Sequence, residues 1–278
     1  MVKASGFWGG LAALVFISTA TQAAVINYPD FSDTSGLTLN GDAHQVGNVL
    51  RLTGNTTGQA GSAFSTNLVN LDLNASFSTK FVFNISAPGG ICDVDGCGAD
   101  GIVFVVQTVA NNVGGAGGGI GYLGINNSLG VEFDTWDNGS SLGDLDGNHV
   151  AVDIGGTFTS SPYATVANRM NDGQNHYVWI DYNGATDLLE VRLSLADSRP
   201  VAALLSGAFD LPTILGATDA FVGFTSGTGA AYGNHDILSW EFRSTFDPID
   251  EPNGVPEPWS VLLFGAGLAG LGLARRRH

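Results

Sequence analysis

Short runs in which apolar and polar residues alternate are the feature that most constrains the fold of this chain. They follow the period of two that is typical of strands, and no long stretch from Val25 to Arg243 keeps the 3.6-residue period of an amphipathic helix. Clusters of Gly, Asn, Asp and Ser, which favour turns, separate the runs. The segments predicted to be strands are Leu37–Leu39, Val49–Leu52, Phe77–Phe83, Ile102–Val106, Tyr177–Tyr182, Leu189–Leu195 and Ile237–Phe242.

Length and composition favour one large β domain. The 278 residues are 44% hydrophobic and include 16 Phe, which is enough apolar material for a sizeable core and excludes wholesale disorder. The 40 Gly follow no Gly-X-Y period, which excludes collagen and favours a turn-rich β protein. No repeat or internal linker precedes Asp247, so we expect one all-β antiparallel sandwich.

The first 24 residues resemble a secretory signal peptide. A basic Lys3 precedes an uncharged, mostly apolar stretch from Phe7 to Ile17, and small residues at Ala23 and Ala24 offer a cleavage site. The alternative, a buried or membrane helix, is disfavoured because the apolar run is shorter than the roughly 20 residues that a span requires.

The C-terminus resembles the PEP-CTERM sorting signal of Gram-negative bacteria. Val255-Pro256-Glu257-Pro258 precedes a short apolar stretch, expected to be helical, from Trp259 to Ala274, and Arg275–Arg277 follow. The arginines would hold the basic end in the cytoplasm. The resemblance implies export, recognition by an exosortase, transient anchoring in the inner membrane, and location in the periplasm, the cell envelope or the extracellular matrix. A permanent anchor is the alternative, although 16 residues is short for a stable span.

The part between these ends is strongly acidic. Setting aside Lys3, Arg275–Arg277 and Glu257 leaves 6 basic against 25 acidic residues, a formal charge of −19. Nucleic acid is therefore excluded as a partner. Two interpretations stay open: the charge keeps an exported protein soluble, or some carboxylates hold divalent cations.

Two features of the loops have simple expectations. Cys92 and Cys97, the only cysteines, are expected to form one local disulfide, because C-x4-C alone is a weak zinc motif. The glycine-rich run from Gly114 to Gly119 is interpreted as a surface loop that lies close to a ligand or another backbone, or as a flexible connector.

The densest group of polar residues lies between positions 131 and 154. If residues 131–136 form a strand, Glu132, Asp134 and Trp136 lie on one face. An antiparallel return through the loop brings His149 beside the two carboxylates. Oxygen ligands suit Ca²⁺, and an added imidazole suits Mn²⁺ or another transition metal, so two adjacent ions are expected.

Four motifs in register across residues 25–243 together resemble the legume-lectin family. They imply a concanavalin A-like β-sandwich or jelly roll that binds carbohydrate. The expected organisation is a signal peptide (1–24), an L-type lectin-like domain (25–246), a linker (247–254) and the sorting signal (255–278). The motifs are Ala99-Asp100-Gly101, Gly121-Tyr122-Leu123-Gly124, Glu132-Phe133-Asp134-Thr135-Trp136 with Asn138, Asp144 and His149, and Gly223-Phe224-Thr225 through His235 to Trp240.

The resemblance also implies ligand sets for the ions. The transition metal would be held by Glu132, Asp134, Asp144 and His149. Calcium would be held by Asp134, Asn138, Asp144 and the carbonyl of Trp136. The loop before His149 lacks the family's usual proline, so Asp146 is an alternative to Asp144, which we favour for its five-residue distance to His149.

For the sugar, the resemblance implies a polar grip with an aromatic wall. Asp100, after a cis peptide bond to Ala99, would accept hydrogen bonds from sugar hydroxyls. The Asn138 side chain and a glycine amide, Gly121 with Gly119 as its neighbour, would complete the grip. Trp136 would stack on an apolar sugar face. The variable loop, residues 227–233 with Ala230, would help to select the sugar, and the disulfide insert before Asp100 would shape the rim.

Two rival functions stay open. The segment from Glu132 to Asp137 partly resembles the carboxylate cluster of a laminarinase-type glycoside hydrolase. However, Glu132 and Asp137 lie roughly 16 Å apart along a strand, whereas the carboxyl groups of a retaining pair lie about 5 to 5.5 Å apart. We therefore expect no enzyme. A structural matrix protein could keep the sandwich without sugar binding. The expected partners are glycans or exopolysaccharide and the exosortase, and the oligomeric state stays open.

Overall fold

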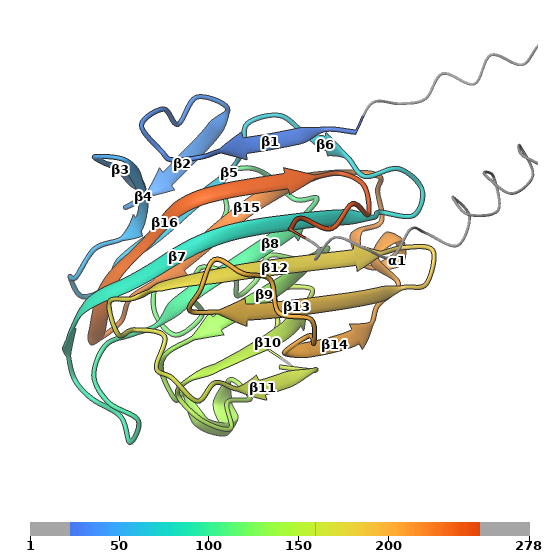
Figure 1. The fold of residues 1–278 in the computed structure, drawn as a ribbon. Coiled ribbons are helices and arrows are strands. Elements are labelled where there is room, and N and C mark those ends of the chain that lie inside the picture. The colour runs from blue at the N-terminus through green and yellow to red at the C-terminus, as the bar shows by residue number, and fades with distance from the viewer. Residues whose placement is uncertain (1–22, 159, 251–278) are drawn as a thin grey trace, which may run out of the picture.

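The computed structural model describes residues 23–158 and 160–250, which form a sandwich of two antiparallel sheets (Figure 1). The predicted sorting signal and most of the predicted signal peptide lie outside the described residues. No helix among the described residues is long and apolar enough to cross a membrane.

The first sheet has eight strands in the order β14-β13-β12-β7-β16-β4-β3, with β1 paired to β16. Its long central strands β7 and β16 pair over most of their length, with two register shifts. The strands are β1 (Val25–Tyr28), β3 (His44–Val46), β4 (Val49–Thr53), β7 (Phe77–Gly90), β12 (Asn175–Asn183), β13 (Leu188–Ser194), β14 (Leu205–Ala208) and β16 (Ala231–Arg243).

The second sheet also has eight strands, in the order β11-β10-β9-β8-β15-β5-β2, with β6 paired to β15. The strands are β2 (Leu37–Gly41), β5 (Ala60–Ser65), β6 (Val69–Asn70), β8 (Gly101–Gln107), β9 (Ser128–Asp134), β10 (His149–Ile154), β11 (Tyr163–Thr165) and β15 (Asp219–Gly227). Two short helices complete the described part of the chain, η1 (Gly139–Ser141) and α1 (Leu211–Leu215).

Alternate side chains of the central strands fill the space between the sheets. Phe81 of β7 packs edge-on against both Phe133 of β9 and Phe224 of β15, at ring-centroid distances of 5.7 and 5.0 Å. These rings belong to a continuous core of fully buried side chains that includes Phe104 and Trp240. Burial of such aromatic area is the main stabilising contribution to a sandwich of this kind.

The outer face of the second sheet is also covered at its centre. Val103 and Val105 of β8 point away from the main core, and Ile120 and Tyr122 of the loop between β8 and β9 pack over them. Every residue of β8 and β9 is consequently buried. Glu132 of β9 pairs with Val103 and therefore lies on this covered outer face.

The fold class and the predicted strands are confirmed, with one correction at the site. β9 ends at Asp134, so the expected strand of residues 131–136 is two residues too long. The chain turns because the Trp136 amide donates to Asp134 Oδ1 at 2.6 Å and the Thr135 amide donates to the Asp100 carbonyl at 2.9 Å. The direction of the Trp136 side chain is therefore not set by the period of the strand.

Candidate functional site

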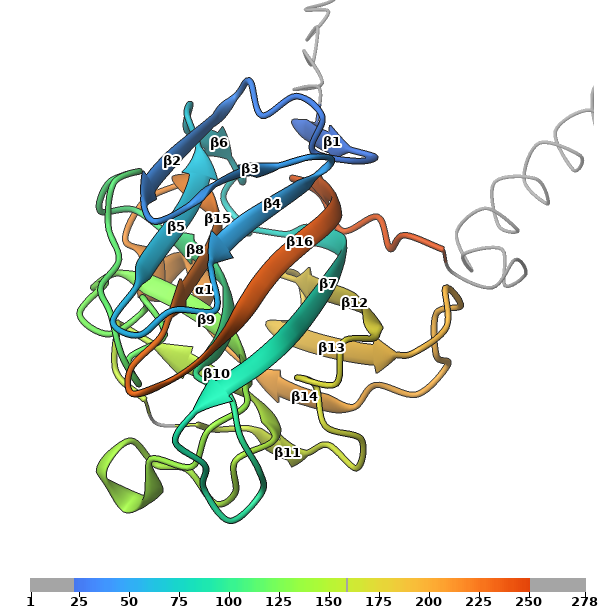
Figure 2. The same cartoon turned by 90° about the vertical axis from the view of Figure 1, so that its left-hand side faces the viewer.

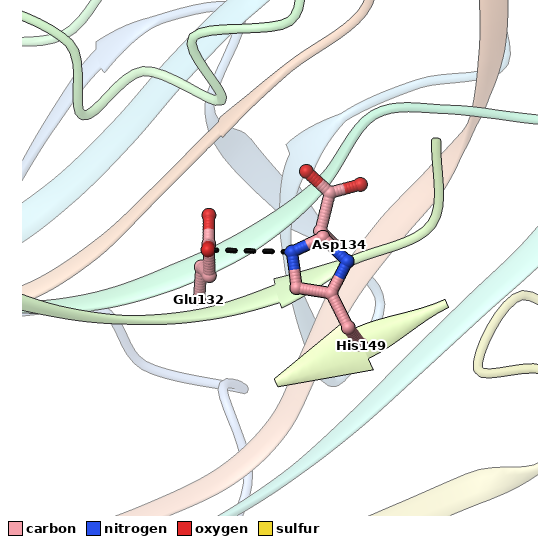
Figure 3. A group of neighbouring side chains, drawn as sticks. All are labelled: Glu132, Asp134 and His149. Carbon is pink, nitrogen blue, oxygen red and sulfur yellow. Dashed lines mark hydrogen bonds and ion pairs between the residues drawn. The ribbon is translucent and has the colours of Figure 1, made fainter. Parts of the chain in front are cut away.

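Strand register brings two carboxylates and one imidazole together on the outer face of the second sheet. Glu132 and Asp134 are two apart on β9, and His149 at the start of β10 pairs directly with Asp134. Their ligand-type atoms all lie within 4.8 Å of one another, and all three residues are buried. Figure 3 shows the three side chains facing one another, with the His149 ring beside both carboxylates.

The His149 ring is held in a fixed orientation. Nδ1 lies 2.9 Å from the Asp146 carbonyl oxygen, to which it donates, and the ring stacks on Tyr163 at a centroid distance of 4.4 Å. Nε2 is thereby directed at Glu132, whose Oε1 is 3.3 Å away. A backbone carbonyl that accepts from one ring nitrogen while the other faces acidic oxygens is the usual arrangement of a metal-binding histidine.

The loop of residues 135–148, here called the acidic loop, adds Asp144 and Asn138. Asp144 is 7% exposed, and its Oδ2 accepts from the Asn138 amide at 2.6 Å. Asp146 uses its carboxylate locally, because Oδ1 accepts from the Asn148 amide at 2.9 Å and Oδ2 accepts from the Thr165 hydroxyl. The geometry thus favours Asp144 over Asp146 as the acid that faces the cluster.

The electrostatics of the cluster reflect an excess of buried negative charge. Burial, reinforced by the charges of Glu132 and Asp144, raises the pKa of Asp134 well above its ordinary value. Burial likewise raises the pKa of Asp144 to about 6. For His149, burial alone would lower the pKa, but the hydrogen bond and charge of Glu132 outweigh it and raise the pKa. These carboxylates lie in a place where a cation would be strongly favoured.

Side-chain oxygens in the described part of the chain fit such a cation. Among the buried side-chain atoms that have no hydrogen-bond partner are Glu132 Oε2, Asp144 Oδ1 and Asn138 Oδ1. Buried acceptors without partners are costly and rare, so a group of them in one place points to a ligand. Two or three carboxylates with one imidazole suit a transition metal, and carboxylate with amide oxygens suits Ca²⁺.

Asp100 lies next to this cluster, at the junction of two strands. The Ala99–Asp100 peptide bond is cis, as the family resemblance implies. Its amide donates to the Gly227 carbonyl at the end of β15, at 3.1 Å. Asp100 is only 4% exposed, its Oδ2 lacks a hydrogen-bond partner, and burial together with the charge of Asp144 raises its pKa to about 7.

The glycine-rich run contacts Asn138 through Gly118, a residue that the sequence did not single out. A Cβ added to Gly118 would lie 2.5 Å from Asn138 Nδ2, so a larger residue there would displace the Asn138 side chain. A Cβ on Gly121 would instead meet Thr225 of β15 at 2.8 Å, and one on Gly119 would meet Leu123 at 2.8 Å. The run therefore approaches another part of the chain closely at Gly118 and is not a free connector.

The remaining expected sugar residues lie at the edge of this group. Trp136 is half-buried and follows the end of β9 directly. Ala230 is exposed on the loop between β15 and β16, and its carbonyl accepts from the Ile91 amide at 3.4 Å. The adjacent Gly229 lies between Asp100 and the glycine-rich run. A Cβ there would lie 3.8 Å from Asp100 Oδ2 and 3.9 Å from the Gly117 Cα.

Cys92 and Cys97 are joined by a disulfide. It closes a hairpin, residues 91–98, which directly precedes Ala99 and Asp100 and extends from the same end of the sandwich as the acidic loop (Figure 2). Ile91 and Val94 of this hairpin are exposed.

Sequence reasoning missed four residues that contribute to the site. Ser160 donates from Oγ to Glu132 Oε1 at 3.1 Å, and no spacing motif indicates this long-range contact. Gly118 was one of several candidates in a glycine run, and only the conformation of the loop distinguishes it. Asp93 and Asp95 of the hairpin contact the acidic loop, whereas the sequence indicated only a disulfide-closed loop that would shape the rim.

The comparisons with known proteins agree with this arrangement. The model of the legume lectin domain family matches residues 23–257. An L-type lectin-domain containing receptor kinase VIII.1 of Arabidopsis thaliana is 32% identical over 68% of this chain, and the bark lectin of Styphnolobium japonicum is 35% identical over 63% of it. The chain spans 26% of the length of the receptor kinase and 64% of the length of the bark lectin.

Solved lectin structures share the fold. The basic winged bean lectin with Tn-antigen aligns with a TM-score of 0.66 and 26% identity over 80% of this chain and 98% of its own. Winged bean acidic lectin complexed with methyl-α-D-galactose aligns with a TM-score of 0.68 and 26% identity over 80% and 98%. The family model covers most of the chain, and sequence relatives and solved structures point the same way, so the chain belongs to the legume lectin domain family.

Proposed function

We propose that this protein is a carbohydrate-binding protein whose sugar site is shaped by two bound metal ions. The observation that carries the proposal is that Asp100 and Asn138 both adjoin Asp144 of the buried acidic group, with Gly118 of the glycine-rich run against Asn138. Asp100 Oδ2 is a buried acceptor without a hydrogen-bond partner, and Gly118 leaves the backbone bare beside the Asn138 side-chain amide. Sugar hydroxyls supply the donors that such acceptors require. Relatives that are lectins, including one solved with a galactoside, support this assignment.

In this proposal the acidic loop, held by the chain's own contacts, would bind the ions and so present the polar groups of the sugar site. Glu132, Asp134, Asp144 and His149 would hold Mn²⁺ or another transition metal. Asp134, Asn138, Asp144 and the Trp136 carbonyl would hold Ca²⁺. The bound ions would supply positive charge that balances the buried carboxylates. The chain itself orients the metal-ligand side chains. The Asp146 carbonyl accepts from the His149 ring, and the Asn138 amide donates to the Asp144 carboxylate.

The sugar would be recognised by this chain's own groups. Asp100 would accept hydrogen bonds from hydroxyls, and Asn138 with a backbone amide of the glycine-rich run would complete the polar contacts. Gly118 is closer to Asn138 than Gly119 or Gly121, so we propose its amide as the one that contacts the sugar. Trp136 would provide an apolar surface for one face of the ring, and the loop with Ala230 would border the ligand.

A hydrolase on the same fold is not favoured by this geometry. Glu132 is fully buried, and its Oε1 is bonded to His149 and Ser160, so it faces the inside of the site. Asp137 Oδ1 accepts from the Gly139 amide of its own loop. A retaining glycosidase needs two carboxyl groups that face one scissile bond, and these two do not.

We further propose that the chain is exported from a Gram-negative bacterium and acts in its envelope or exopolysaccharide matrix. The sequences at the two ends support this, the first as a signal peptide and the last as a PEP-CTERM signal that an exosortase would recognise. Membrane contact would be transient, through the apolar segment of residues 259–274. Matrix glycans would then be the natural ligands.

A glycan array probed with the purified protein in Ca²⁺ and Mn²⁺, beside a chelated sample, tests the proposed function. We expect binding to one class of glycan that disappears on chelation. Binding that resists chelation would contradict the metal-shaped site. Silence in both conditions would contradict sugar binding and favour a structural matrix protein on the same sandwich.

A further inference from the structure

The disulfide hairpin, residues 91–98, makes direct contacts with the acidic loop that carries the proposed calcium ligands. Both carboxylates of the hairpin take part. Asp93 Oδ2 accepts from the Asp137 amide at 2.9 Å, and Asp95 Oδ2 accepts from the Gly147 amide at 2.8 Å. The two bonds lie on either side of Asp144 in the sequence, so they fix the acidic loop near both of its ends.

The hairpin is itself rigidly built. The disulfide joins Cys92 to Cys97, and the Asp93 amide donates to the Gly96 carbonyl at 2.9 Å. Asp93 Oδ1 accepts from the amides of Asp95 and Gly96, at 2.9 and 2.8 Å. Asp93 thus uses one oxygen to shape the hairpin and the other to hold the acidic loop. A short closed ring has few other conformations, so it can present its carboxylates in fixed positions.

A second set of contacts braces the hairpin from the other side. Asn171 Nδ2 donates to the Cys97 carbonyl at 3.0 Å. The Arg169 guanidinium lies against Gly96. Its Nη2 donates, at 3.4 Å, to the carbonyl of Thr135, which is the first residue of the acidic loop. At the base of the hairpin, the Ile91 amide donates to the Ala230 carbonyl at 3.4 Å, in the loop that borders the sugar site.

We propose that the Cys92–Cys97 hairpin is a clamp that holds the acidic loop in the conformation competent for binding calcium, with Asp93 and Asp95 as its positioning residues. This inference rests on the proposed metal-shaped function and deepens it. Neither residue is proposed as a metal ligand; both act by accepting from backbone amides of the acidic loop. The clamp lowers the conformational entropy that the loop would otherwise lose when an ion binds.

The two aspartates differ in a way that makes the clamp testable. Asp93 uses both oxygens as acceptors, so Asp93→Asn would turn an NH₂ group toward one of the three amide donors. The Asp95 bond to Gly147 uses one oxygen, so Asp95→Asn can keep it. We therefore expect Asp95→Ala and Asp93→Asn each to weaken Ca²⁺ binding about tenfold, whereas Asp95→Asn stays within about twofold of wild type.

The matched control is Asp33→Ala. Asp33 is exposed, accepts from the Ser35 amide at 2.8 Å in a local turn, and belongs to a different segment of the chain. This variant removes one negative charge and two local hydrogen bonds, from the Ser35 amide and hydroxyl, without touching the acidic loop. Equal losses of Ca²⁺ affinity in Asp33→Ala and Asp95→Ala would mean that net charge, and not the clamp, governs the affinity.

The first measurement is amide hydrogen exchange in the full protein without added metal. We expect the Asp137 and Gly147 amides to be protected in wild type and Asp95→Asn, and the Gly147 amide to be exposed in Asp95→Ala. The double variant Cys92→Ser, Cys97→Ser should lose protection at both amides. Unchanged protection in Asp95→Ala and in the double cysteine variant would overturn the clamp.

The second measurement is calorimetric titration of the same variants with Ca²⁺ alone. Weaker binding by Asp95→Ala, rescued by Asp95→Asn, supports the clamp. Wild-type affinity in Asp95→Ala and in the double cysteine variant would overturn it. If wild type binds neither ion nor glycan, the proposed function fails. The link to calcium then fails with it, while the hydrogen-exchange result still decides whether the hairpin holds the loop.

Discussion

Two regions of the molecule bury acidic side chains, and they neutralise them differently. On the outer face of the first sheet, Asp181 is 1% exposed and lies 2.6 Å from Arg199 Nη2 and 3.6 Å from Arg192 Nη1. At the candidate site on the second sheet, Glu132, Asp134 and Asp144 gather around His149, with no lysine or arginine forming an ion pair with them in the part of the chain that the structure describes.

The difference shows where buried carboxylates have no cationic Lys or Arg side chain beside them in the described part of the chain. A buried carboxylate is tolerated when a cationic side chain compensates it, as at Asp181. One imidazole cannot compensate three carboxylates, so the site end requires another source of positive charge or must bind protons. Raised pKa values at Asp134 and Asp144 express this requirement. If the site holds cations as proposed, part of the acidic composition serves metal binding.

The largest effect is expected for Asp134→Ala. Because Asp134 is proposed to bind both ions, its loss should abolish binding of Ca²⁺ and Mn²⁺ at millimolar concentration and remove sugar binding with it. Calorimetric titration and glycan binding check this. Asp219→Ala, an exposed position at the opposite end of β15, serves as the control. Wild-type sugar binding by Asp134→Ala would refute the metal-dependent site.

The second prediction concerns Asp181, the buried carboxylate that arginines compensate. Arg199→Ala should lower the free energy of unfolding by about 3 kcal/mol, because it leaves Asp181 buried with a weaker partner. The loss should be the same with and without chelator, as measured by urea unfolding. Arg243→Ala is the control, since its partners Glu241 and Asp247 are more exposed and such pairs contribute at most about 1 kcal/mol.

A third prediction separates the sugar from the ions. Asp100→Ala should weaken glycan binding by about 10- to 100-fold, because a carboxylate that accepts from hydroxyls is lost. Binding of Ca²⁺ and Mn²⁺ should remain, since Asp100 is not among the proposed ligands. Titrations with metal and with glycan on the same sample check this. Parallel loss of both activities would place Asp100 in the metal site.

The smallest effect concerns the exposed border of the compensated region. Asp250 contacts Lys80 and accepts from Trp179 Nε1 at 3.3 Å, and these interactions lower its pKa although burial opposes them. A lowered pKa means that the stabilisation is present above the ordinary pKa and is lost as the pH falls through the folded one.

Asp250→Asn should therefore cost about 0.5 kcal/mol at pH 7, a cost that shrinks as the pH falls from 5 to 3. Urea unfolding at the two ends of this range measures the difference between variant and wild type. A cost that grows toward acid would show that the sign of this pKa shift is wrong.

The sequence predicted the sandwich well because its information is local. Alternation in runs such as Phe77–Phe83 and Ile102–Val106 marks strands, and a period of two placed Glu132 and Asp134 on one face. The same rule failed at Trp136, because a side-chain contact from Asp134 to the Trp136 amide ends the strand. Periodicity does not contain such a contact.

Loop contacts were beyond prediction for a different reason. The choice among Gly118, Gly119 and Gly121 depends on how the glycine-rich run folds over Asn138, which only the backbone conformation decides. The bonds from Asp93 to Asp137 and from Asp95 to Gly147 join positions 44 and 52 residues apart. No motif spacing encodes those pairs. The metal and sugar roles of the individual residues stay predictions.

The central claim is that cations, and not protons or side chains, balance the carboxylates of the site. The most direct test is calorimetric titration of the chelator-treated protein at pH 7 with Mn²⁺ and then Ca²⁺, with the melting temperature followed in parallel. We expect one ion of each kind to bind per chain and the melting temperature to rise with metal concentration, as linkage requires. A protein that binds neither ion and melts at the same temperature with and without them would contradict it.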